Sequence, residues 1–110
     1  MNTITITITY DSKQKLLIFN DGKNIGIDIT TVVQKGDFVI WKPAAFSDLS
    51  SLDNIIDSSK VNVFYPGPKK NADGSWQGTV TAAAGTSESY FVLYTVKGLL
   101  KIQDPKIQVH

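Results

Sequence analysis

After two residues the chain reaches the stretch Thr3-Ile4-Thr5-Ile6-Thr7-Ile8-Thr9-Tyr10, in which threonine alternates with a large apolar residue. All but the last of these residues are β-branched, and such residues favour extended backbone. A period of two places the apolar side chains on one face of a strand, whereas a helix would scatter them around its circumference. The stretch therefore predicts a β-strand with one apolar face and one threonine face.

Short apolar runs recur along the rest of the chain, and turn residues such as glycine, asparagine and proline separate them. The runs predict further strands at residues 16–19, 25–33, 38–41, 61–65, 76–81, 90–96, 99–102 and 106–109. Strands at this spacing, seven to nine in a chain of 110 residues, are typical of one compact all-β domain. We therefore predict a single domain, residues 1–110, folded as a two-sheet Greek-key sandwich.

The segment from Pro43 to Ser59 has a different texture, because serine and aspartate are mixed with apolar residues. Leu49, Leu52, Ile55 and Ile56 fall at helical spacing, and Ser47 is a suitable N-terminal cap. We expect one short helix or structured loop around residues 47–58, spanning the two sheets at one end.

The charge and cysteine content exclude several classes of function. The chain carries 11 basic and 10 acidic residues, so it lacks the positive field with which nucleic-acid-binding proteins neutralise phosphates. It contains no cysteine and no apolar stretch long enough for a membrane span. Its start is neither basic nor continuously apolar, so we see no signal peptide and expect a cytoplasmic location by default. A mature form whose leader was removed is the alternative. We predict no nucleic-acid partner and no membrane partner.

Two parts of the sequence carry a resemblance to the cupredoxin family. Val33-Gln34-Lys35-Gly36-Asp37-Phe38-Val39-Ile40-Trp41 resembles the strand that precedes the first copper histidine of that family. Tyr90-Phe91-Val92-Leu93-Tyr94, with the closing Lys106-Ile107-Gln108-Val109, resembles the family's last hairpin. Trp76, Gly78, Tyr90 and the run Asp104-Pro105-Lys106-Ile107 also resemble small bacterial copper-free sandwiches. The resemblance implies a cupredoxin-like fold.

The copper chemistry of the cupredoxins does not carry over. A blue-copper site needs a cysteine thiolate and two imidazoles, usually with an axial methionine. Tyr94 stands at the cysteine position, His110 is the only histidine, and Met1 is the only methionine. We therefore predict a metal-free scaffold with no cofactor. A histidine-dependent triad is also excluded, because a terminal histidine is not held in a fold interior.

The aromatic residues suggest a ligand site at one rim of the sandwich. Trp76 follows a polar loop that contains Asn71 and Asp73, and Tyr65 precedes Pro66-Gly67-Pro68. A tryptophan beside polar side chains suits stacking on a sugar ring or docking of a peptide. We therefore name Trp76, Tyr65, Asp73 and Asn71 as candidate ligand-binding residues for a glycan or a peptide.

The first strand suggests a site of assembly. An unpaired strand at a sheet edge is a template for another chain, and no lysine or proline guards this one. Thr3, Thr5, Thr7 and Thr9 would form such an edge, and pairing through it predicts a homo-oligomer. The sequence thus favours a non-enzymatic binding or self-assembly module. A small carbohydrate-binding domain is the alternative, and a hydrolase with an unrecognised site is the third hypothesis.

Overall fold

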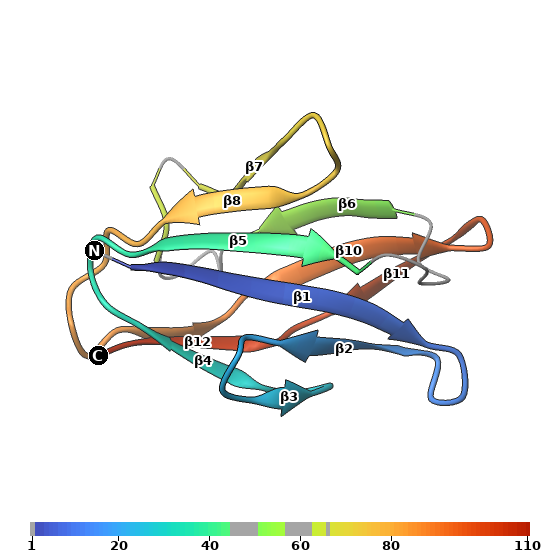
Figure 1. The fold of residues 1–110 in the computed structure, drawn as a ribbon, viewed down its shortest axis with the longest axis horizontal. Coiled ribbons are helices and arrows are strands. Elements are labelled where there is room, and N and C mark those ends of the chain that lie inside the picture. Colours follow the sequence, from blue (N-terminus) through green and yellow to red (C-terminus); the bar gives the residue numbers. More distant parts are fainter. Residues whose placement is uncertain (1, 45–50, 57–62, 66) are drawn as a thin grey trace.

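The computed structural model describes residues 2–44, 51–56, 63–65 and 67–110. These residues form twelve strands in three hydrogen-bonded sheets, of six, three and three strands, and no helix (Figure 1). The all-β prediction is confirmed, but the strand number exceeds the predicted seven to nine and the sheets number three. The two-sheet Greek-key sandwich and the resemblance to cupredoxins are not confirmed. Among the described residues there is no helix long and apolar enough to cross a membrane.

The largest sheet is built around the alternating N-terminal stretch. Its strand order is β3 (Ile25–Gly26), β2 (Leu16–Asn20), β1 (Thr3–Asp11), β5 (Phe38–Pro43), β8 (Trp76–Thr79) and β7 (Lys69–Lys70). β1 runs antiparallel to β2 and parallel to β5. Ile6 and Ile8 are fully buried, as the period of two predicts.

Two three-stranded sheets complete the fold (Figure 1). One has the order β11 (Leu99–Gln103), β10 (Phe91–Val96), β6 (Ser51–Ile56), and the other the order β4 (Thr30–Val33), β12 (Lys106–Val109), β9 (Ser87–Ser89). The core lies between these sheets and the six-stranded sheet. Inside it, the indole N–H of Trp41 donates to the Tyr90 hydroxyl at 3.0 Å, and both side chains are fully buried.

The predicted strand 25–33 is wrong as a single element. The chain forms β3 in the six-stranded sheet, bends at residues 27 and 28, and enters another sheet as β4. Ile29 is buried in the core, whereas Ile27 is 37% exposed. The apolar pattern is continuous through this segment, but the partner strand changes, and only the tertiary structure shows that change.

The predicted short helix is also wrong where the structure describes it. Residues 51–56 form β6, while residues 47–50 and 57–58 lie outside the described residues. Leu52 pairs with Tyr94 and Asn54 with Leu93, so Asp53 is an extra residue, a β-bulge. The bulge shifts the alternation by one position. Leu52 and Ile55, three residues apart, therefore both face the core. A spacing of three between buried residues is also typical of a helix, which is why the sequence pattern predicted one.

Two smaller differences concern strand boundaries. Of the predicted strand 61–65, the structure describes residues 63–65, and there Phe64 forms an isolated bridge with Val80. Residues 87–89, which lie outside the predicted strands, form β9 and pair with β12.

Candidate functional site

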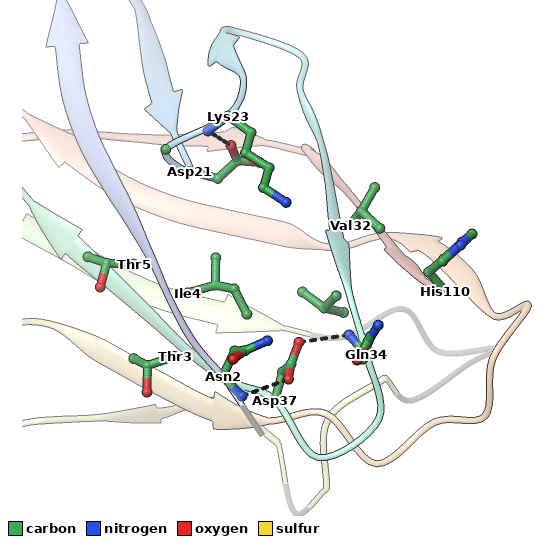
Figure 2. Close-up of a pocket in the computed structure, with 12 residues that line it drawn as sticks. Asn2, Thr3, Ile4, Thr5, Asp21, Lys23, Val32, Gln34, Asp37 and His110 are labelled. Carbon is green, nitrogen blue, oxygen red and sulfur yellow. Dashed lines mark hydrogen bonds between the residues drawn. The ribbon is translucent and has the colours of Figure 1, made fainter.

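A cavity lies where β1 extends beyond the end of its neighbour β2. β2 pairs with β1 only from Thr7 to Asp11, so the first residues of β1 extend past the end of β2. Across the gap runs β4, which pairs on its other side with β12 (Figure 2). We call the space between Thr3–Thr5 of β1 and the end of β4, from Val32 to the following Gln34, the β1–β4 opening. Its volume is about 620 Å³.

Backbone groups of β1 face this opening. The Phe38 N–H donates to the Asn2 carbonyl at 2.8 Å, and the Ala44 N–H donates to the Ile8 carbonyl at 2.8 Å. The even-numbered residues of β1 therefore direct their backbone groups toward β5. Because these directions alternate along a strand, Thr3 and Thr5 direct their N–H and C=O groups toward the opening.

β4 presents the same arrangement from the opposite side. The Lys106 N–H donates to the Ile29 carbonyl at 2.9 Å, and the His110 N–H donates to the Val33 carbonyl at 2.8 Å. The odd-numbered residues thus bond to β12, and Val32 directs its N–H and C=O toward the opening. Among the described residues, no strand pairs with Thr3, Thr5 or Val32 on the side that faces the opening.

Asp37 closes one end of the opening. Its side chain is 4% exposed, and one carboxylate oxygen accepts the Asn2 N–H at 3.0 Å while the other accepts the Gln34 N–H at 2.8 Å (Figure 2). The residue follows Gly36, whose φ of 93° favours glycine in this turn. The carboxylate therefore joins the start of β1 to the end of β4, and beyond it the two strands diverge.

The turn around Asp21 closes the other end. One carboxylate oxygen of Asp21 accepts the N–H groups of Lys23 at 2.9 Å and Asn24 at 2.7 Å, and the other accepts the Thr31 hydroxyl at 2.9 Å. Partial burial opposes ionisation of Asp21, but these hydrogen bonds outweigh it and lower the pKa of the carboxyl below its usual value. The side chain of Lys23 extends over the opening (Figure 2).

The chemistry of the opening is that of a strand edge. Its lining includes Ile4, which packs against the core, and the buried Val33. In the part of the chain that the structure describes, no three histidine, cysteine or acidic residues gather to hold a metal ion. What the opening offers is a set of backbone hydrogen-bonding groups, an apolar base and the single ammonium group of Lys23.

The structure divides the predicted assembly edge in two. Thr7 and Thr9 pair with Asn20 and Ile18 of β2, so they form no free edge. Thr3 and Thr5 lie at the opening. Asp37 and Val32 also line the opening, but no sequence pattern shows where one strand ends beside another, so the sequence did not indicate them.

The predicted rim site is brought together only in part. Asn71 donates to the Ser75 hydroxyl at 3.0 Å, and this hydroxyl donates to Asp73 at 2.6 Å. Trp76 is 7% exposed, and its indole N–H donates to the Leu52 carbonyl at 3.2 Å, so its ring belongs to the core. Tyr65 is 74% exposed. Stacking of a sugar on Trp76 would require this ring to leave the core, and glycan binding stays a prediction.

Comparison with known proteins leaves the family open. No family model matches the chain, and no curated protein matches its sequence.

Proposed function

We propose that this chain is a non-enzymatic binding module that takes up an extended polypeptide segment as an added strand in the β1–β4 opening. The observation that carries the proposal is the set of six backbone groups, the N–H and C=O of Thr3, Thr5 and Val32, that face the opening from both sides. An extended peptide presents the complementary donors and acceptors on both of its edges, as in other cases of strand addition.

The size of the opening fits such a segment. A strand residue advances about 3.3 Å, and it occupies about 4.8 Å across the sheet and about 10 Å through it, which gives roughly 160 Å³. The cavity volume of about 620 Å³ therefore corresponds to a short segment of a few residues. Side chains on its inner face would lie over Ile4 and Val33, so we expect a preference for small apolar residues there.

The expected affinity is low. Six hydrogen bonds contribute about 1 kcal/mol each after the exchange with water, roughly 6 kcal/mol in total. Ordering four residues of a flexible peptide costs about as much. The apolar contacts over Ile4 and Val33 then decide the outcome, and a micromolar to millimolar complex with rapid exchange follows.

We propose a metal-free cupredoxin-like scaffold for this module. The two segments that carry the resemblance form β5 and the strands β10 and β12. β5 pairs with β1 in parallel and β12 pairs with β4 in parallel, so the resembling segments flank the opening on both sides.

The test is a titration of isotopically labelled protein with acetyl-Thr-Val-Thr-Val-Thr-amide, followed by NMR. We expect the amide signals of Thr3, Thr5 and Val32 to shift, and their hydrogen exchange to slow. The backbone amides of Thr7 and Thr9 point to the same side of β1 as those of Thr3 and Thr5, but they are already paired with β2. They therefore serve as internal controls.

A proline variant separates strand addition from surface adsorption. Thr5→Pro removes an N–H that faces the opening and leaves the pairing with β5 intact, so the fold should persist and peptide binding should fall. Shifts spread evenly over the surface, or unchanged binding by Thr5→Pro, would contradict the proposal.

Self-assembly is a second candidate, favoured by a different edge. β11 is the outermost strand of its sheet, and its Leu100 and Ile102 are 66% and 61% exposed. An apolar edge strand of this kind promotes pairing between copies. Sedimentation of the chain and of Ile102→Lys over a range of concentrations tests this: association that the variant abolishes supports it, and a monomer at every concentration rejects it.

A further inference from the structure

A second cavity lies between the β1–β2 turn and the β10–β11 turn, which sit together at the end of the molecule remote from both termini (Figure 1). We call it the hairpin-end cavity. Its volume is about 240 Å³, and it draws its walls from both hairpins, including Tyr10 and Lys15 from the first and Val96, Lys97, Leu99 and Lys101 from the second. The β1–β4 opening shares none of these residues.

The base of the hairpin-end cavity is apolar. Val96 is 4% exposed and belongs to the core. Tyr10 packs against the core, and its ring lies 6.5 Å from that of Tyr94. Leu99 stands opposite Val96 in the β10–β11 register, yet it is 65% exposed. An apolar side chain this exposed beside a cavity provides a surface for an acyl chain or a ring.

The rim of the cavity is cationic. Lys15, Lys97 and Lys101 all line it, and no ion pair within the described residues neutralises any of the three. Three lysines beside an apolar base attract an anion that carries an apolar body. A purely apolar ligand would leave the lysines without a role, and a purely ionic one would leave Leu99 uncovered.

The backbone supplies an independent observation. Within the described residues, the only two non-glycine residues with positive φ are Lys15, at 58°, and Lys97, at 50°. Lys97 precedes Gly98, whose φ is 79°, so the pair occupies the two left-handed positions of a tight hairpin turn. Asparagine is the usual residue at the first of these positions, because it tolerates this conformation better than lysine does. Lys15, which ends the longer β1–β2 loop, and Lys97 both adopt a conformation that is uncommon for lysine, and both line this cavity, as is typical of functional sites.

We propose that the hairpin-end cavity binds an anionic amphiphile, with its carboxylate or phosphate at Lys15, Lys97 and Lys101 and its acyl chain or ring against Tyr10, Val96 and Leu99. A soluble fatty acid and an anionic lipid in a bilayer share this chemistry. Two arms of one experiment distinguish these sources.

The first arm is calorimetric titration with sodium decanoate below its micelle concentration. The second is co-flotation with vesicles of phosphatidylcholine alone or mixed with phosphatidylglycerol. We expect binding in at least one arm, weaker at high salt because salt screens the lysines. No binding of decanoate together with no preference for phosphatidylglycerol vesicles would overturn the proposal.

Lysine variants test the rim without loss of the fold. Lys97→Asn removes a charge and introduces a residue that the turn favours, so we expect a higher midpoint temperature of unfolding and about fivefold weaker binding. Lys13→Asn is the matched control, since Lys13 is an exposed lysine of the β1–β2 turn that does not line the cavity. Unchanged binding by Lys97→Asn, or an equal loss in Lys13→Asn, would overturn the proposal.

Two neighbouring leucines identify the source. Leu99 and Leu100 are 65% and 66% exposed, but only Leu99 lines the cavity. A soluble amphiphile in the cavity requires that Leu99→Ser weakens decanoate binding and that Leu100→Ser does not. Insertion of the hairpin end into a bilayer requires that both variants weaken flotation. If neither substitution alters binding in either arm, the apolar half of the proposal is wrong.

Discussion

The side chain of Gln103 takes the place of a strand beside β2, and its removal should destabilise the fold measurably. Its amide oxygen accepts the Leu17 N–H at 2.9 Å, and its amide nitrogen donates to the carbonyls of Leu17 and Ile27, both at 2.9 Å. Leu17 lies beyond the reach of β3, which pairs with β2 only at Phe19 and Asn20. One side-chain amide therefore satisfies both backbone groups of a residue whose side chain is fully buried.

The substitution Gln103→Leu retains the approximate volume and leaves the Leu17 N–H and C=O without partners. Each unsatisfied buried backbone group costs about 1–3 kcal/mol. Gln103 is half-buried, so water reaches part of the site, and we expect a total loss of about 2–3 kcal/mol. For a chain of this length the midpoint temperature should fall by roughly 8–15 °C.

Urea unfolding gives the free energy, and hydrogen exchange of the Leu17 amide locates the loss. Gln108→Leu is the matched control, because Gln108 is exposed on β12 and makes no side-chain hydrogen bond among those found in the described residues. It should change stability by less than about 0.5 kcal/mol. If Gln103→Leu is equally mild, or if the Leu17 amide keeps its protection, the amide is not a structural substitute for a strand.

Three further predictions concern packing and ionisation. In thermal unfolding, Gly78→Ala should lower the free energy of unfolding by about 1–3 kcal/mol, because the new Cβ would lie 2.9 Å from Cδ1 of Phe64. The new Cβ of Gly26→Ala meets only an ordinary contact, so this variant should lose less stability, and equal losses would refute the packing argument. The pKa of Asp21 is lowered in the folded protein, so the ionised carboxylate stabilises the fold above the unfolded pKa of 3.8, and this stabilisation disappears as the pH falls below it. In urea unfolding, the free energy of unfolding of Asp21→Asn should therefore depend less on pH in the acid range than that of the unsubstituted protein. An unchanged pH dependence would contradict this. Burial raises the pKa of Tyr90 far above its usual value of 10.0, so the free energy of unfolding should fall as the pH rises above about 10. Urea unfolding at pH values on either side of 10 should show a smaller fall for Tyr90→Phe, and an identical fall would count against this.

The sequence predicted the features that local pattern determines. The alternation in residues 3–10 places Ile6 and Ile8 in the core whichever strands lie beside them. Pro105 separates β11 from β12, as expected for a residue that cannot donate to a ladder. These predictions needed no knowledge of the partner strands, and they are confirmed.

The features that failed depend on partners distant in sequence. The spacing of Leu52 and Ile55 is helical in one dimension, but β10 imposes a bulge on β6 and brings both residues to the core. Trp76 follows a polar loop, a position typical of a rim residue, yet its indole turns inward to the Leu52 carbonyl. The β1–β4 opening exists because β2 stops opposite Thr7, and the length of one strand relative to another is not encoded in either strand alone.

At three places the edge of a strand lacks a partner strand within its own sheet, and these places differ in what takes that partner's position. Beside Leu17, where β3 ends, the amide of Gln103 supplies the missing hydrogen bonds. At the start of β1 the carboxylate of Asp37 accepts an N–H from each side. At the β1–β4 opening, none of the hydrogen bonds found in the described residues joins a side chain to the backbone groups of Thr3, Thr5 or Val32. Because the side chains of Gln103 and Asp37 supply the missing partners at two of these places, the unpaired groups at the third support the addition of a strand from outside.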